Sequence, residues 1–199
     1  ADHAHDHAHD HAHDEAEAHG HEHGHDHSGV DPHAWLDPAN AAIWLDAIAG
    51  ALSAVDPENA DAYAENASAA IGEIVALTAE IAADLAPFRD RGFIVFHDAY
   101  HYFEGRFGVE AAGAISLSDA AEPGVARISA IRERIEDMGA VCVFAEPQFR
   151  PALVETVIEG TEARAGVLDP LGADLALGPT LYPLLLRNLR DSLADCLGG

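Results

Sequence analysis

Two stretches in the first half of the chain have apolar residues at the spacing of an α-helix. The first follows Asp37 and Pro38, which suit the cap and the first position of a helix, and continues to about residue 55. The second starts with the same Asp-Pro signal at residue 56, and no helix breaker interrupts it before Pro87. We expect one helix over 56–85, roughly 43 Å long at about 1.5 Å per residue. Its buried stripe is expected to comprise Ile71, Ile74, Leu77, Ile81 and Leu85.

The second half of the chain alternates short apolar runs rich in β-branched residues with stretches of helical pattern. This alternation is typical of an α/β fold, in which helices cover both faces of a parallel sheet. Functional groups in such folds gather at the carboxyl ends of the strands. The expected strands are 92–96, 108–115, 140–146 and 165–169, and the expected helices are 99–106, 125–138, 150–160 and 179–196.

Residues 1–28 contain no large apolar side chain, although they hold 11 of the 14 histidines and 8 carboxylates. Because such a segment has nothing to bury against the entropy of ordering, we expect a disordered tract that binds metal weakly at many places. An expression tag is the alternative, but tags are usually uniform His runs, whereas this segment alternates His with Asp, Ala, Glu and Gly. The expected tract ligands are His3, His5, His7, His9, His11, His13, His19, His21, His23, His25 and His27.

The charge balance excludes several classes of partner. The chain carries 35 acidic and 10 basic residues, a formal charge of −25 at pH 7. A surface of this sign repels nucleic acid and anionic lipid, and it concentrates cations. No apolar run reaches the roughly 20 residues that span a bilayer, and no signal-peptide pattern opens the sequence. We therefore expect a soluble chain whose export signal has been removed, with no nucleic-acid partner and no insertion into the membrane.

Two histidines are candidate zinc ligands on the residues alone. His33 lies between prolines in DPHAWLDP, which restrain its backbone ahead of a helix, and Trp35 is an expected packing anchor. A surface loop residue is the alternative for His33. His97 ends the expected strand FIVF, where ligands of open α/β sheets bind. Both predictions rest on the preference of zinc for neutral imidazole nitrogen.

Other polar residues near these histidines have less certain roles. Asp98 is expected to cap the helix that follows His97. His101 is a candidate auxiliary ligand, one helical turn from His97, but no glutamate occupies the general-base position of an HExxH enzyme, so we do not expect an enzyme. Glu146 and Asp169 end later strands. Each is either a loop or capping residue, or a carboxylate that binds metal or orients a metal ligand.

Four ordered motifs carry a resemblance to a known family. The His-rich tract is followed by VDPHAWLDP, FIVFHDAYHYFEGRFGV, VCVFAEPQFRPALVETV and GVLDPLGADLALGPTLY. In this order they resemble the zinc-uptake solute-binding proteins of the ZnuA type, and the match covers nearly all of residues 1–199. The resemblance implies a cluster A-I binding protein, in which a long helix joins two α/β lobes and the metal lies between them.

The resemblance also implies particular ligands and domains. His33 and His97 are implied as zinc ligands, Asp169 in VLDPLG as a further ligand, and His101 stands where no family ligand is expected. A third histidine is implied in an amino-terminal lobe, which is largely missing from these residues. The implied domains are the tract (1–28), a remnant of the amino-terminal lobe (29–55), the linking helix (56–87) and the carboxy-terminal α/β lobe (88–199).

The two cysteines, Cys142 and Cys196, permit either one disulfide or two buried thiols on their number alone. The resemblance implies the disulfide, as expected for an exported protein. On the chain-entropy account, closing a loop of this length stabilises the fold by roughly 4 kcal/mol.

The function that the resemblance implies is zinc transport. We expect a monomeric, periplasmic zinc-binding component of an ABC importer, which captures Zn²⁺ and delivers it to the membrane permease. A zinc buffer or metallochaperone that acts through the His-rich tract alone is the alternative. Deletion of residues 1–28 distinguishes the two, because only the transport protein keeps a tight zinc site in its folded part.

Overall fold

The computed structural model describes residues 30–116 and 124–199. Residues 1–30 and residues 31–199 are two separate units. The predicted metal-binding tract lies outside the described residues, so its role stays a prediction.

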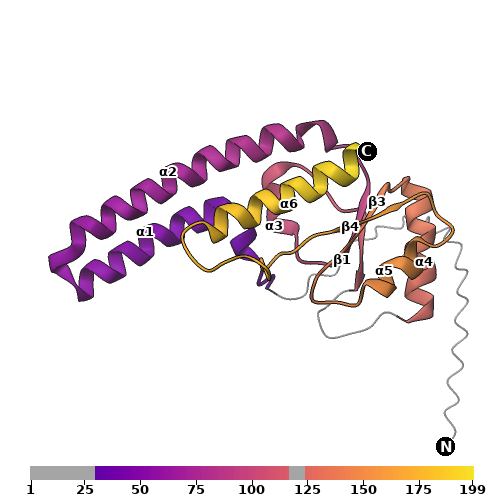
Figure 1. The fold of residues 1–199 in the computed structure, drawn as a ribbon, viewed down its shortest axis with the longest axis horizontal. Coiled ribbons are helices and arrows are strands. Elements are labelled where there is room, and N and C mark those ends of the chain that lie inside the picture. Colours follow the sequence, from indigo (N-terminus) through magenta and orange to yellow (C-terminus); the bar gives the residue numbers. More distant parts are fainter. Residues whose placement is uncertain (1–29, 117–123) are drawn as a thin grey trace, which may run out of the picture. The chain divides into compact units, whose positions relative to one another are not determined.

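A sheet of four parallel strands forms the centre of residues 31–199, with the strand order β2-β1-β3-β4 (Figure 1). The strands are β1 (Phe93–His97), β2 (Gly113–Ser116), β3 (Cys142–Ala145) and β4 (Arg164–Val167). Parallel pairing brings the carboxyl ends of all four strands to one edge of the sheet. The α/β fold expected from the alternating pattern is confirmed.

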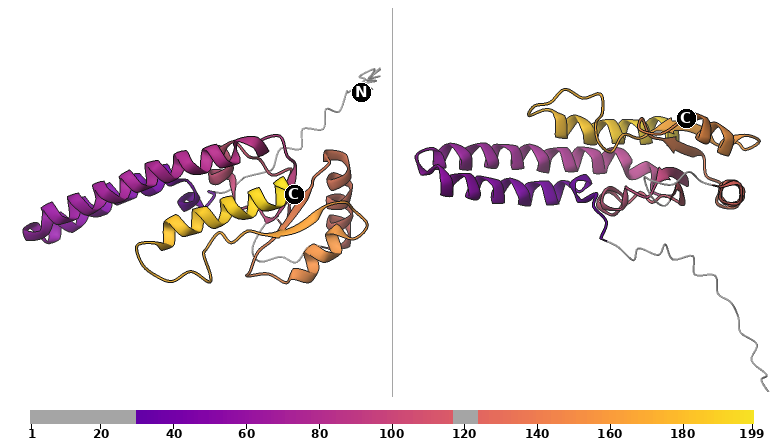
Figure 2. Two further views of the ribbon diagram at one scale, coloured as in Figure 1. Left: turned by 45° about the horizontal axis from the view of Figure 1, so that its top comes forward. Right: turned by 90° about the horizontal axis from the view of Figure 1, so that it is seen from below.

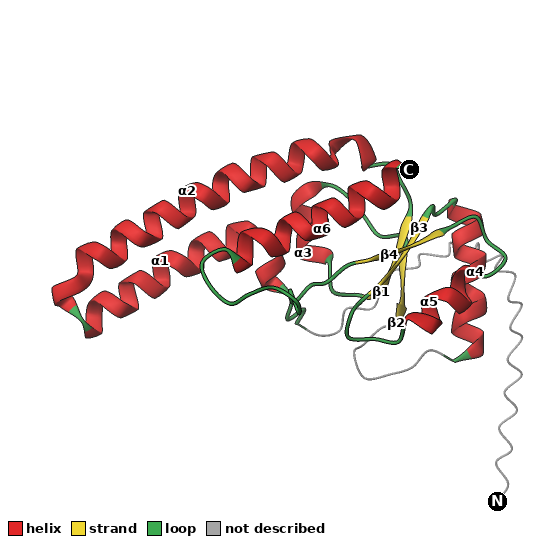
Figure 3. Cartoon of the chain, viewed as in Figure 1, coloured by secondary structure: helices red, strands yellow, loops and turns green. Residues whose placement is uncertain are grey.

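Helices cover both faces of this sheet (Figure 3). They are α3 (His101–Phe107), α4 (Val125–Met138), α5 (Pro151–Ile158) and α6 (Leu181–Gly198). Alternate residues of β1 enter different cores, as the period of two along a strand requires. Phe93 and Val95 belong to the core formed with α3 and α6, whereas Ile94 and Phe96 belong to the core formed with α4 and α5.

A helical hairpin precedes the sheet (Figure 2). Its helices are α1 (Pro38–Val55) and α2 (Ala60–Leu85), connected through a short 3-10 turn at Pro57–Asn59. α2 has 26 residues, which give a length of about 39 Å. The predicted stripe is confirmed in its last four positions, which are buried, while Ile71 is half-buried. This stripe packs against the core that α6 also enters.

α1 is apolar but hardly buried. Ile43 is 64% exposed, Ile48 54% and Val55 81%. A groove of about 560 Å³ lies between α1, α2 and the start of α6, and most of its lining is apolar, including Trp44, Ile48 and Leu52. Among the described helices α1 alone is long and apolar enough to cross a membrane, by length and composition only, which is weak evidence for a span. The hairpin therefore presents an apolar face that the described residues leave uncovered.

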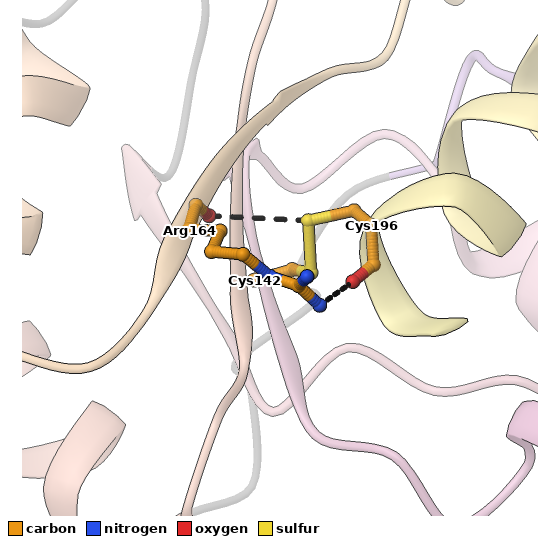
Figure 4. Close-up of a disulfide and its surroundings, with 3 residues drawn as sticks. All are labelled: Cys142, Arg164 and Cys196. Atoms are coloured by element: carbon orange, nitrogen blue, oxygen red, sulfur yellow. Dashed lines mark hydrogen bonds between the residues drawn. A yellow bond between two sulfur atoms is a disulfide. The ribbon is translucent and has the colours of Figure 1, made fainter. Parts of the chain in front are cut away.

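The predicted disulfide joins Cys142 on β3 to Cys196 on α6 (Figure 4). Cys142 is fully buried, and Cys196 is 9% exposed. The Arg164 guanidinium donates to the carbonyl oxygen of Cys196, so β4 also holds the end of α6. The bridge thus ties the last helix of the chain to the third strand of the sheet.

Two local predictions are wrong. Asp98 does not cap a helix, because α3 begins only at His101 with Tyr100 at its N-cap, and the Asp98 carboxylate instead lies 2.9 Å from Nε2 of His101. The second strand starts at Gly113 rather than at 108, because Gly108 has a left-handed backbone (φ 69°) that ends α3. The residues between Gly108 and Gly113 are therefore a loop.

Candidate metal centre

His97 occupies a buried position at the carboxyl end of β1. Its ring Nδ1 lies 2.5 Å from Oε1 of Glu146, the residue that follows β3, and its backbone N–H donates to the same oxygen at 3.3 Å. His97 is 6% exposed and Glu146 is 2% exposed. A carboxylate that accepts the Nδ1 proton fixes the tautomer in which Nε2 carries the lone pair. Glu146 thus holds the His97 imidazole in place, and its expected role toward a metal ion stays a prediction.

His33 is held in the same way by a different carboxylate. Its Nδ1 lies 2.8 Å from Oδ1 of Asp31, and its backbone N–H donates to that oxygen at 2.9 Å. The His33 side chain is 13% exposed and the Asp31 side chain 22%, so this pair lies nearer to solvent than His97 and Glu146 do. Asp31 was not among the residues predicted from the sequence. Its spacing two residues before a histidine, in DPH, is the signal that could have revealed it.

The two imidazoles meet through their remaining nitrogens. Nε2 of His33 lies 3.4 Å from Nε2 of His97, and the ring centroids are 5.3 Å apart. Two nitrogens that each bind a tetrahedral zinc ion at about 2.05 Å are separated by about 3.3 Å. With both Nδ1 atoms directed at carboxylates, the two Nε2 lone pairs face one another at the spacing that one shared zinc ion requires.

Trp35 attaches the His33 loop, residues 31–37, to the segment that follows β4 and to α6. The indole N–H of Trp35 donates to the carbonyl oxygen of Pro170 at 2.9 Å, and the hydroxyl of Tyr182 donates to the carbonyl oxygen of Trp35 at 2.9 Å. The Trp35 ring also meets the His33 ring edge-on, with the centroids 5.3 Å apart. Trp35, predicted as a packing anchor, packs against the main core. These contacts bring His33 to His97 across 64 residues of sequence.

Asp169 stabilises a loop in this structure. Its carboxylate accepts the backbone N–H groups of Leu171 and Gly172 at 3.0 Å each and that of Ala173 at 2.6 Å, together with the side-chain amide of Gln148 at 3.2 Å. Among the residues that the structure describes, no three His, Cys, Asp or Glu side chains are arranged to hold one metal ion. The structure therefore brings His33 and His97 together, and the expected role of Asp169 as a metal ligand stays a prediction.

His101 lies in a separate ionisable cluster on the first turn of α3. Its Nε2 is 2.9 Å from Asp98, and its Nδ1 is 3.6 Å from Oε2 of Glu104. Burial raises the pKa of Glu104 to about 7 even though His101 opposes the shift. The pKa of His101 is also raised: its burial works against this, and the charge of Asp98 and the hydrogen bond with Asp98 outweigh the burial. The burial of Glu104 is not predictable from the sequence, because a glutamate on a short helix usually faces solvent.

Comparison with known proteins gives a consistent result. The sequence pattern of the family described as "Zinc-uptake complex component A periplasmic" (ZnuA) matches residues 1–196. The high-affinity zinc uptake system protein ZnuA of Brucella abortus (strain 2308) is 57% identical over 167 residues, which are 84% of this chain and 50% of that protein. The protein of the same name from Paracoccus denitrificans is 52% identical over 172 residues, 86% of this chain and 53% of that protein.

Solved structures agree with these sequence matches. A crystal structure of ZnuA superposes with a TM-score of 0.74 at 28% identity, covering 84% of this chain and 62% of that chain. The laminin-binding protein Lmb of Streptococcus agalactiae, described as having adhesin and metal transporting activity, superposes with a TM-score of 0.77 at 28% identity. The superposition covers 86% of this chain and 66% of that chain. This chain spans about half the length of its curated relatives. On the family match and these identities, the chain belongs to the ZnuA family of zinc-uptake proteins.

Proposed function

We propose that this chain is the zinc-binding part of a periplasmic solute-binding protein, which captures Zn²⁺ and delivers it to the membrane permease of an ABC importer. His33 and His97 bind the zinc ion through Nε2, and Asp31 and Glu146 orient them through Nδ1. The observation that carries the proposal is the facing Nε2 pair at 3.4 Å in a member of a zinc-uptake family. Zinc is the cargo, and the proposed role is transport rather than catalysis.

The His-rich tract has a supporting role in this proposal. Its eleven histidines and eight carboxylates collect zinc through weak contacts that exchange rapidly, and the folded part then binds the ion more tightly. The alternative, a zinc buffer that works through the tract alone, makes the folded part dispensable for binding. The periplasmic location of the chain and its monomeric state belong to the same proposal.

The experiment is a calorimetric zinc titration of the chain without residues 1–28, a deletion that removes no described core residue. One tight zinc ion per chain is expected. His33→Ala and His97→Ala are each expected to weaken it by more than about 100-fold, beyond the 10- to 100-fold typical of losing a group that only orients a ligand. His101→Ala is the matched control, a nearby histidine whose ring faces Asp98, and is expected to change the affinity by less than about threefold.

The outcomes separate the two functions. If the shortened chain binds zinc only weakly, and neither His33→Ala nor His97→Ala changes that binding, the tract is the functional part and the transport proposal is wrong. A tight site that responds to all three histidine substitutions would instead add His101 to the ligands. If the shortened chain keeps its full zinc affinity after His97→Ala, the proposed site formed by His33 and His97 is wrong.

We also propose that the exposed apolar face of α1 and α2 packs against the polypeptide that corresponds to the remaining half of the relatives' length. The groove on this face is lined mainly by apolar side chains, including Trp44, Ile48 and Leu52, which suit an apolar partner surface. On this proposal residues 29–55 belong with the amino-terminal lobe and α2 links the lobes. The half of the Brucella relative that this chain does not match, added as a separate polypeptide, is expected to co-purify with this chain, and Ile48→Asp at the groove is expected to prevent it. Equal recovery with Ile48→Asp would contradict this arrangement.

A further inference from the structure

The His33 loop has a second attachment, an ion pair between Asp37 and Arg106. Nε of Arg106 donates to Oδ1 of Asp37 at 2.7 Å, and one terminal nitrogen donates to Oδ2 at 2.8 Å. This is the two-pronged geometry in which a guanidinium binds a carboxylate most strongly. The Asp37 side chain is 15% exposed and the Arg106 side chain 37%, so solvent screens the pair only in part.

Asp37 is joined rigidly to His33. Between them lies one 3-10 turn, Ala34–Leu36, in which the N–H of Leu36 donates to the carbonyl oxygen of His33 at 3.0 Å. Leu36 is fully buried in the main core. Asp37 itself caps α1, because its Oδ1 accepts the backbone N–H of Ala39 at 2.8 Å. A displacement of Asp37 is therefore transmitted to His33 through a short, hydrogen-bonded turn.

Arg106 is joined equally closely to His97. It lies on α3, the helix that starts four residues after His97, and the buried side chains Phe103 and Phe107 hold this helix in the same core as Leu36. The hydrogen bonds and charge of Arg106 lower the pKa of Asp37 although burial of the carboxyl group opposes the shift. The pair stays ionised well below neutral pH. It connects the loop that carries one histidine to the helix that follows the other.

We propose that Asp37 and Arg106 are positioning residues of the metal centre, which set the distance between His33 and His97. The inference rests on the proposed function, since it gives the two histidines the same zinc ion. Trp35 attaches the His33 loop on the side of β4 and α6, whereas Asp37 attaches it on the side of α3. With both attachments in place, the loop cannot bend between the histidines, so His33 and His97 move together.

The test uses the full chain with its eleven tract histidines replaced by Asn, titrated with Zn²⁺ against a chelator and with Co²⁺ followed by its visible absorption. Asp37→Asn keeps the helix cap, because Asn caps as well as Asp, and removes the charge. Arg106→Gln removes the other partner. Each is expected to weaken zinc binding about threefold to tenfold and to change the cobalt spectrum. Arg106→Lys is expected to restore part of the affinity, since Lys keeps the charge without the two-pronged geometry.

The chain offers a matched control in Arg187 and Glu80. These residues form the same kind of pair between α6 and α2, with nitrogen–oxygen distances of 3.0 and 2.8 Å, and the Arg187 side chain is 38% exposed. Arg190 also donates to Glu80, so Arg187→Gln is expected to lower the melting temperature by at most as much as Arg106→Gln does, while zinc affinity and the cobalt spectrum stay unchanged.

The outcomes separate this inference from the proposed function. Equal zinc affinity and an unchanged cobalt spectrum in Arg106→Gln and the parent chain would overturn the positioning role. A parallel loss of affinity in Arg106→Gln and Arg187→Gln would also overturn it, since general destabilisation would then explain both. If the parent chain itself has no tight site that depends on His33 and His97, the proposed function fails instead.

Discussion

Nε2 of His97 and Nε2 of His33 lie 3.4 Å apart, but different parts of the molecule hold the two side chains in place. His97 ends a central strand, and both it and its partner Glu146 are almost completely buried. His33 lies in a loop, and its partner Asp31 is within reach of solvent. The sheet fixes His97 through core packing, whereas hydrogen bonds and one ion pair fix His33 from outside. The two ligands proposed for one site therefore differ widely in how strongly the fold enforces their geometry.

The largest expected effect concerns the sheet that supports His97. Replacing both cysteines, Cys142→Ser with Cys196→Ser, releases α6 from β3 and is expected to lower the free energy of unfolding by about 2 to 4 kcal/mol. Urea unfolding of the oxidised protein and the double variant measures this. Zinc affinity of the still-folded variant is expected to stay within about tenfold, because Glu146 and Asp31 remain in place. An unchanged free energy of unfolding would show that the bridge does not support the sheet.

The next effect concerns the buried partner of His97. Glu146→Ala is expected to weaken zinc binding about 10- to 100-fold, because the imidazole loses the acceptor that fixes its tautomer and orientation. Glu146→Gln retains an acceptor oxygen and is the matched control, with a smaller expected loss. The same calorimetric titration measures both. A zinc affinity that Glu146→Ala leaves unchanged would mean that core packing alone orients His97.

A smaller effect concerns α3, the helix that connects the two halves of the site. Glu104 has a pKa of about 7, above its ordinary value of 4.5, so the folded chain binds this proton more tightly than the unfolded chain does. Stability is therefore expected to fall as pH rises from about 4.5 to 7. The raised pKa of His101 acts in the same direction above pH 6.5. Glu104→Gln is expected to flatten this dependence and to be more stable at pH 8 by on the order of 1 to 2 kcal/mol.

Thermal or urea unfolding at pH 5 and pH 8 tests this prediction. At pH 5 the parent chain and Glu104→Gln are expected to differ little, since Glu104 is then protonated in the folded state. A variant that is less stable than the parent at pH 8 would show that the ionised carboxylate is favoured at this place. At each pH, zinc affinity is expected to be equal in Glu104→Gln and the parent chain, because the ionisable groups that act on the pKa of Glu104 are His101, Asp98 and Glu110.

The smallest effect concerns Asp31, the half-buried partner of His33. Asp31→Ala is expected to weaken zinc binding by less than about tenfold, because solvent can replace part of what this carboxylate does and Trp35 still holds the loop. The comparison between the two histidines predicts that Glu146→Ala has the larger effect in the same titration. The reverse order would show that the loop, and not the sheet, determines the affinity.

Much of the fold follows from the sequence because local pattern and tertiary packing agree. The short apolar run FIVF predicts a buried strand and the helical spacing in 60–85 predicts a helix, and the structure has both. The disulfide also follows, although only the family resemblance selected it over two thiols. The helix boundaries near Asp98 and Gly108 were less predictable, since several polar residues there compete for the cap position.

The site was predictable only in part. His33 and His97 were identified by motif and by position at a strand end, and the structure brings them together. Asp31 was missed, because a carboxylate next to a proline gives no periodic signal. Asp169 was expected near a metal, but its oxygens accept three backbone N–H groups of its own loop, a contact that depends on the loop's three-dimensional course. Hydrogen bonds of this kind cannot be predicted from the spacing of residues along the sequence.

The pairing of each imidazole with a carboxylate also determines the charge that the site can accept. Asp31 and Glu146 bring two negative charges beneath the two rings, and a divalent cation cancels both. A monovalent cation would leave one buried negative charge without compensation, which is costly away from water. On the proposed function zinc binds only neutral imidazole, so zinc affinity is expected to fall as the pH falls.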